Sequence, residues 1–264
     1  MAKIGFIGMG NMGYAMLKGA LALYDSSEIV FADTNRDRVM QVYHDTSVRF
    51  MESNAECVNA AKYIVLAVKP QFYPAVLKNI VNILRPDQVL ISIAPGKTIE
   101  YLQQTLGYDK RIVRVMPNTP ALIGEGMSGV SFDQDKFYPD EKEEILKFLS
   151  SFGKVKIVEE RLMDVVTCAS GSSPAYVYMF IEALADSAVK YGMSRQDAYT
   201  FAAQTVMGSA KMVLETGKHP GELKDMVCSP GGTTIAAVEA LEENGFRNAV
   251  MKATDACYEK CTKV

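Results

Sequence analysis

The sequence predicts a two-part α/β protein, with an open, mostly parallel sheet in residues 1–160 and an all-helical part in residues 161–264. Three observations support this fold class. Short apolar strand patterns alternate with helical patterns through the first part, as in a doubly wound sheet. A glycine-rich turn joins the first strand to the first helix. No strand pattern persists beyond about residue 161.

The composition and charge of the chain exclude some classes of binding partner. The chain has 264 residues, 28 Lys and Arg and 31 Asp and Glu, for a net charge of −3. Because no basic cluster is present, we expect no nucleic-acid or membrane partner, and no apolar run is long enough to span a bilayer. The first residues form a strand pattern and not a signal peptide. We therefore expect a cytoplasmic protein whose five cysteines are reduced thiols.

The first strand, residues 3–7, runs into Gly8, Gly10 and Gly13, and a helix follows. The first glycine of such a G-x-G-x-x-G motif allows a tight turn, and the second lets the backbone approach a pyrophosphate. The third lets the helix pack closely on the strand. Between a strand and a helix, the motif predicts a Rossmann-type domain that binds a dinucleotide.

The second strand, residues 28–32, ends where the adenosine ribose of a dinucleotide would be bound. Asp33 favours the free ribose hydroxyl of NAD, whereas Thr34, Asn35 and Arg36 offer donors for the additional phosphate of NADP. We favour NADPH, with NADH as the alternative. Asp33 could instead cap the helix that begins near Arg36.

Further strands and helices alternate up to residue 160. The loops that follow the strands meet at the carboxyl edge of the sheet, where a doubly wound sheet binds its ligands. Lys69 follows a buried strand, which favours a functional role over a solvated one. The expected strands are residues 63–68, 89–93, 112–116, 126–132 and 154–158, and the expected helices are residues 54–60, 72–84 and one that Pro139 opens.

The second part reads as helices only. The first begins at Ser173 and Pro174, and an apolar stripe at three-and-four spacing predicts a buried face made of Val177, Phe180, Ile181, Leu184 and Ala188. Because about a hundred residues hold so much alanine and methionine, we infer that this part buries a face against a second copy of the chain. The other expected helices are residues 195–215, 220–227 and 233–243, and one from 246 onward.

A second glycine turn, residues 229–234, precedes one of these helices. Gly231 and Gly232 let a ligand approach the main chain, and unpaired amides at a helix start favour an anion. Thr233 and Thr234 add hydroxyls. The turn is therefore suited to a small carboxylate or phosphate beside a neutral hydrogen-bonding group, although an ordinary helix start with a flexible lead-in has the same pattern.

Residues for metal or Ser/His chemistry are scarce. His44 and His219 are the only histidines and lie far apart in the sequence. Cys257 and Cys261 are one helical turn apart, but no histidine lies near them, so we expect no metal site.

Five stretches carry a resemblance to a known family. They are IGMGNM (residues 7–12), AVKPQ (67–71), RVMPNTP (114–120), GSSPAY (171–176) and SPGGTT (229–234). On these motifs the chain resembles, nearly end to end, the pyrroline-5-carboxylate reductase family, oxidoreductases of the last step of proline biosynthesis. Hydroxyacid dehydrogenases of similar nucleotide fold carry an essential lysine on the long interdomain helix, and residues 176–188 contain none.

The resemblance implies hydride transfer from NAD(P)H to the cyclic imine pyrroline-5-carboxylate, giving L-proline. It also implies a homodimer through the helical part and, in many members, a ring of five dimers. It implies that Thr234 approaches the ring nitrogen and that Ser229, Gly231, Gly232 and Thr233 bind the substrate. It implies a cofactor site of Ile7, Gly8, Gly10, Asn11, Met12, Gly13, Thr34, Asn35, Arg36, Asn54, Ala67, Val68, Lys69, Pro70, Ala94, Pro95 and Gly96.

Three residues depart from the family pattern. Asp33 leaves the choice between NAD and NADP open, Pro95 stands where a small alanine is usual, and Cys228 stands where a hydroxyl residue is common. Two other functions fit the same residues. The protein could reduce a six-membered cyclic imine, or it could be a nucleotide-binding scaffold without catalytic activity.

Overall fold

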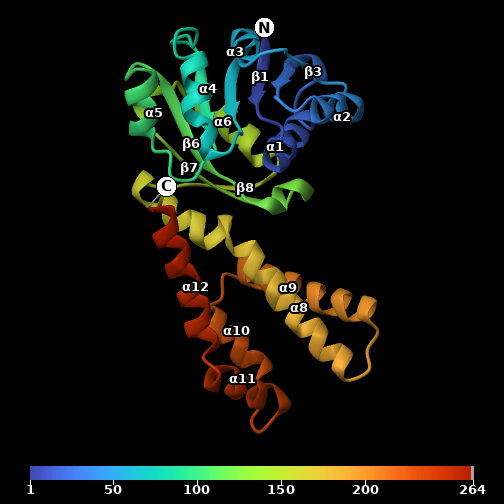
Figure 1. The fold of residues 1–264 in the computed structure, drawn as a ribbon. Helices are drawn as coiled ribbons and strands as arrows, with labels where there is room; N and C mark the ends of the chain where they lie inside the picture. The colour runs from blue at the N-terminus through green and yellow to red at the C-terminus, as the bar shows by residue number, and fades with distance from the viewer. Residues whose placement is uncertain (263–264) are drawn as a thin grey trace. The chain divides into compact units, whose positions relative to one another are not determined.

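The structure is a computed structural model that describes residues 1–262. The chain forms two compact units (Figure 1). Unit 1 comprises Met1–Ser172 together with the C-terminal segment from Cys257, and unit 2 comprises Ser173–Ala256. The chain thus leaves unit 1 once, forms the helical unit, and returns for its last turns.

Unit 1 contains an eight-stranded sheet of order β3-β2-β1-β4-β5-β6-β7-β8. All neighbouring strands are parallel except β7, which runs antiparallel to β6. The order reverses beside β1, because the chain moves outward through β2 and β3 and then returns to β4. The strands are β1 Ala2–Ile7, β2 Ile29–Ala32, β3 Arg49–Phe50, β4 Ala61–Leu66, β5 Val89–Ser92, β6 Arg111–Met116, β7 Gly126–Phe132 and β8 Gly153–Ile157.

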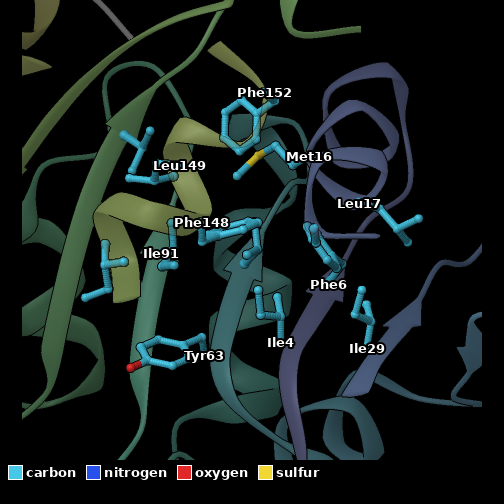
Figure 2. Close-up of a cluster of buried hydrophobic side chains, with 14 of the residues drawn as sticks. Ile4, Phe6, Met16, Leu17, Ile29, Tyr63, Ile91, Phe148, Leu149 and Phe152 are labelled. Atoms are coloured by element: carbon cyan, nitrogen blue, oxygen red, sulfur yellow. The ribbon is translucent and has the colours of Figure 1, made fainter. Parts of the chain in front are cut away.

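Helices cover both faces of this sheet (Figure 1). Alternate strand residues point to opposite faces, so Tyr63 and Val65 enter one apolar cluster while Ile64 and Leu66 enter the other. Figure 2 shows the first cluster, where Phe148 lies near Phe6. Its helices are α1 Asn11–Leu21, α2 Arg36–Thr46 and α6 Pro139–Ser150; the second cluster has α3 Asn54–Ala60, α4 Tyr73–Ile80 and α5 Ile99–Leu106.

The structure differs from the sequence-based expectation in several elements. The strand expected over residues 63–68 spans Ala61–Leu66, so Ala67 and Val68 belong to the loop at its carboxyl end. The two-residue strand β3 and helix α5 have no counterpart in the sequence-based prediction, because each is too short to show a clear period. Helix α7, Met163–Val166, continues into a π-helical turn, Thr167–Gly171.

Unit 2 is all helical, as predicted. Its first two helices pack together where alanines allow a close approach, at Ala185 of α8 and at Ala198 and Ala202 of α9. None of the helices within residues 1–262 has the length and apolarity needed to cross a membrane. The helices are α8 Ser173–Lys190, α9 Arg195–Thr216, α10 Pro220–Val227, α11 Thr233–Glu243 and α12 Phe246–Cys261, whose last turns belong to unit 1.

The apolar stripe of α8 is only partly buried within one chain. Ile181 and Ala188 pack against the α8–α9 cluster. Val177, Phe180 and Leu184 remain 40%, 38% and 38% exposed. The period therefore identified an apolar face, but a single chain does not bury it. An apolar face of this kind is typical of a surface that packs against another chain.

Glu141 is a buried carboxylate of unit 1 that pairs with two cations. It is 5% exposed, and it accepts hydrogen bonds from Arg111 at 2.6 Å and contacts Lys62 at 3.1 Å. Burial raises the pKa of Glu141, but the hydrogen bonds from Arg111 and Lys62 outweigh it, so the pKa lies below its usual value of about 4.5. Glu141 therefore stays ionised in the folded chain at pH values where the unfolded chain binds a proton.

We expect Glu141→Gln to lower the free energy of unfolding at pH 7 by about 3 kcal/mol, because it breaks a buried ion pair. A depressed pKa stabilises the fold above the unfolded value and loses this effect as the pH falls through the folded value. The gap between the two proteins should therefore shrink below about pH 4, measured by urea denaturation. Glu159→Gln, which removes an exposed ion pair with Arg161, is the control and should change little. A gap that stays constant down to pH 3 would contradict this assignment.

Candidate active site

The candidate nucleotide site lies at the carboxyl ends of β1 and β4, where the strand order reverses. Ligands of doubly wound sheets bind at such a switch point. A cavity of about 290 Å³ opens there. Its lining residues come from the last residues of β1 and β2, from the loops after β1, β2 and β4, from the start of α3 and from the helical segments after β4: Ile7, Gly8, Ala32, Asp33, Thr34, Asn54, Val68, Phe72, Ala75, Val76 and Asn79.

A larger cavity, of about 620 Å³, lies at the opposite end of the strands. Lys62 near the start of β4 and Arg111 at the start of β6 line it, with Glu141 between them. These charges already compensate one another. Because the amino ends of parallel strands do not form the ligand crevice of this architecture, we assign the nucleotide to the smaller cavity.

Two glycines of the first turn are required by packing. Gly8 has φ +96°, and a Cβ there would lie 2.7 Å from Val68 Cγ1 and 2.8 Å from the Ala67 carbonyl oxygen. A Cβ at Gly13 would lie 2.4 Å from the Gly8 carbonyl oxygen. The first glycine therefore makes the turn, and the third brings α1 against it, as the motif predicts.

The middle glycine is different. A Cβ at Gly10 would meet no atom within 4 Å, and its φ of −66° is available to any residue. Gly10 is the N-cap of α1 and, as a glycine, has no side chain with which to cap the first amides of this helix. Open space in front of uncapped helix amides fits a pyrophosphate. The residues present are thus compatible with a bound dinucleotide.

Asp33 holds two loops together. One carboxylate oxygen accepts the Met9 amide at 2.5 Å, and the other accepts the Asn35 amide at 2.8 Å. The alternative in which Asp33 caps α2 is wrong, since Asn35 is the cap and its side chain accepts the Arg38 amide at 3.1 Å. Both oxygens of Asp33 therefore have backbone partners that position the glycine turn.

Two arginines of α2 surround this region. Arg36 is exposed, pairs with Glu52 at 3.1 Å and lies over the Phe50 ring at 5.0 Å. Arg38, which the sequence analysis did not single out, donates from Nε to the Met9 carbonyl at 2.7 Å. In the sequence, the only signal for Arg38 is its place in the first turn of the helix that Asn35 caps. Arg38 therefore supports the glycine turn, whereas Arg36 makes only surface contacts here.

The predicted cofactor residues divide into two groups. Five of them, Ile7, Gly8, Thr34, Asn54 and Val68, line the cavity. The others lie outside the lining, on the adjoining loops or in the first turns of α1 and α2, and among them Lys69 is exposed and Ala94 is buried. The sequence analysis missed four lining residues on and before α4, which only the position of this helix after β4 could have indicated: Phe72, Ala75, Val76 and Asn79.

The candidate substrate turn lies in unit 2. Gly231 has φ +68°, and the Gly232 amide donates to the Ser229 carbonyl at 3.0 Å. A Cβ at Gly232 would lie 2.3 Å from Ser229 Oγ. Gly232 is also the N-cap of α11 and makes no side-chain cap. The turn thus presents the first amides of α11, beginning at Thr233, without a capping side chain.

The three glycines of the first turn allow a matched test. We expect Gly10→Ala to leave the melting temperature unchanged but to raise the Kd for NADPH at least tenfold, because the methyl group enters the space before α1. Gly8→Ala should instead destabilise the protein by about 1–3 kcal/mol, because an L-residue is strained there. Thermal denaturation and NADPH fluorescence titration measure the two effects. Unimpaired NADPH binding by Gly10→Ala would show that the pyrophosphate does not lie there.

The chain is similar to known reductases along nearly its whole length. Residues 160–264 match the family described as pyrroline-5-carboxylate reductase dimerisation, and residues 3–96 match the one described as NADP oxidoreductase coenzyme F420-dependent. The chain is 48% identical to pyrroline-5-carboxylate reductase of Escherichia coli (strain K12), covering 99% of this chain and 98% of that protein. Identity to the Methanosarcina acetivorans enzyme is 42%, covering 98% and 96%.

Solved structures agree. The crystal structure of Plasmodium falciparum pyrroline carboxylate reductase with NADP bound has a TM-score of 0.90 and 35% sequence identity, covering 99% of this chain and 97% of that one. These findings support NADP as the cofactor, and the match to a dimerisation family supports homo-oligomerisation. This chain belongs to the pyrroline-5-carboxylate reductase family.

Proposed function

We propose how this chain carries out the reaction of its family, the NAD(P)H-dependent reduction of the cyclic imine pyrroline-5-carboxylate to L-proline. Unit 1 holds the dinucleotide, and the turn at residues 229–234 holds the substrate. The observation that carries the assignment is the start of α11, where Gly232 leaves the first helix amides without a capping side chain. A helix start of this kind favours a carboxylate.

The amides of Thr233 and Thr234 are the best placed to bind the substrate carboxylate. The Gly232 amide already donates to Ser229, so its main contribution is the shape of the turn. The absence of a Cβ at Gly232 keeps the Ser229 side chain in place. Ser229 and Gly231 complete the turn, the second through its left-handed backbone conformation.

We assign the adenosine end to the loop after β2. With both oxygens of Asp33 engaged by backbone amides, Thr34, Asn35 and Arg36 are the groups that remain to bind a ribose phosphate. All three are exposed. Arg36 would exchange its exposed ion pair with Glu52 for the phosphate, which costs little because such pairs are weak. This arrangement supports NADPH over NADH.

Reduction of the imine needs one hydride and one proton on nitrogen. The nicotinamide supplies the hydride when the cofactor is bound. Thr234 is half-buried in the first turn of α11, and its hydroxyl would orient the ring nitrogen. If the substrate enters as the iminium ion, no strong acid is needed, and a threonine suffices. The protein then contributes chiefly orientation.

The assembly and location of the protein follow as part of this proposal. Residues 1–160 bind the dinucleotide, and residues 161–264 bind the substrate and form the dimer. The exposed apolar residues of α8, among them Val177, Phe180 and Leu184, are suited to packing against a second copy. We propose a homodimer that assembles further into a ring of five dimers in the cytoplasm.

The decisive experiment is the oxidation of NADPH and NADH, in separate assays, with pyrroline-5-carboxylate and with a six-membered cyclic imine acid. We expect the highest kcat/KM with pyrroline-5-carboxylate and NADPH. A higher value for the six-membered imine would reassign the substrate. Binding of NADPH without turnover of either imine would identify a scaffold and overturn the proposal.

Substitution of Thr234 tests its role. We expect Thr234→Ala to lower kcat by roughly tenfold to a hundredfold, because the nitrogen loses its orienting hydroxyl. Thr234→Ser should retain more activity, and both variants should keep the circular dichroism spectrum of the parent. Thr105→Ala, which removes an exposed hydroxyl on α5, is the matched control. Turnover near the parent level in Thr234→Ala would remove this residue from the mechanism.

A further inference from the structure

Three thiols from distant parts of the sequence meet in unit 1. The Sγ atoms of Cys168, Cys257 and Cys261 all lie within 4.8 Å of one another. All three residues belong to unit 1, because the chain returns to this unit at Cys257. From the sequence, only Cys257 and Cys261 were expected to lie close together, and no metal site was expected. The fold brings the sulfur of Cys168 beside them.

The arrangement follows from two helical segments. Cys257 and Cys261 are four residues apart on α12 and so project from the same face. Cys168 lies on the π-helical turn after α7 and is 5% exposed, whereas the two thiols of α12 are half-buried. The set is thus closed on the Cys168 side and accessible from the side of α12, and the Cys257 thiol also donates to the Ser172 hydroxyl at 3.3 Å.

We propose that Cys168, Cys257 and Cys261 form a binding site for a thiophilic metal ion, Zn²⁺ or Cu⁺. Sulfur ligands select these metals. Three sulfurs that each lie about 2.3 Å from one Zn²⁺ are about 3.8 Å apart. The three Sγ atoms lie within 4.8 Å of one another, so each pair must approach by at most about 1 Å to reach that spacing. The fourth position of a Zn²⁺ ion would be filled by solvent or by a small external ligand.

Asp164 lies four residues before Cys168 in the sequence, but its carboxylate is already engaged. Its oxygen Oδ1 accepts a hydrogen bond from Arg114 at 3.1 Å, and Arg114 is 2% exposed. Taking Asp164 as a ligand would leave this arginine with Glu160 alone. Three protein ligands are therefore the set that the structure offers.

A disulfide switch explains the cluster less well. A disulfide uses two thiols and gives the third no role, whereas the three sulfurs here are mutually close. A metal ion, in contrast, can take all three sulfurs as ligands, and it displaces their protons on binding.

A bound ion would link the two segments of unit 1 that precede and follow unit 2 in the sequence. Cys168 lies four residues before Ser172, where the chain leaves unit 1, and Cys257 is the residue at which it returns. The ion would therefore fasten the last turns of α12 to the segment after α7. Metal binding to the folded state alone raises its stability by mass action. This property goes beyond the proposed reductase activity and does not depend on it.

The experiment uses the full chain, reduced and freed of metal by a chelator, under anaerobic conditions. Co²⁺ is the spectroscopic probe, followed by displacement with Zn²⁺; Cu⁺ is titrated separately against a chromophoric chelator. We expect one ion per chain, with thiolate-to-Co²⁺ charge-transfer absorption. Zn²⁺ should protect Cys168, Cys257 and Cys261 from alkylation, as mapped by mass spectrometry, and should raise the melting temperature.

Three variants decide the outcome. Cys261→Ser, at a half-buried position, should weaken Zn²⁺ or Cu⁺ binding at least tenfold and abolish the rise in melting temperature. Cys168→Ala should do the same, and Cys261→Ser keeps the test valid if Cys168→Ala does not fold. Cys228→Ser, a half-buried thiol outside the cluster, is the matched control and should bind like the parent. Equal loss in the control, no protection of the three thiols, or a disulfide formed among them without bound metal would overturn the proposal.

Discussion

The close approach of α1 to the first glycine turn is the constraint on which cofactor binding depends. A Cβ at Gly13 would lie 2.4 Å from the carbonyl oxygen of Gly8, so only glycine lets the helix begin this near to the strand. That position sets the uncapped first amides of α1 at the switch point of the sheet. Asp33, from the loop after β2, and Arg38, from α2, then hold the Met9 backbone.

Each of the two units contains a helix that begins at a glycine without a capping side chain. Gly10 begins α1 and Gly232 begins α11, and neither helix start has a capping side chain. Uncapped amides at the positive end of a helix bind anions without a charged side chain. A pyrophosphate suits the first, because the loop after β2 provides donors for the rest of the nucleotide. A small carboxylate suits the second, because Thr234 adds a neutral hydroxyl beside it. A single backbone principle thus supports both halves of the proposed reaction.

Two features of the single chain are suited to a further binding partner: the exposed apolar face of α8 and the cluster of three thiols. Phe180 and Leu184 are apolar but not buried, which agrees with membership of a family that dimerises through this region. The return of α12 to unit 1 brings Cys257 and Cys261 beside Cys168. The thiol cluster arises because the helical unit is inserted between two segments of unit 1, so that the end of α12 lies with the sheet domain.

The amino-acid sequence was enough to predict the strand-turn-helix around Gly8, the start of α3 at Asn54, the helices of unit 2 and, through five motifs, the family. These features are local, because glycine conformations, caps and apolar periods act within a few residues. The three-dimensional fold was needed to find that Asp33 binds the Met9 amide, that Arg38 supports the glycine turn and that three thiols meet. Those partners lie far apart along the chain. No local pattern encodes them, because they depend on which strands become neighbours and on where the last helix returns.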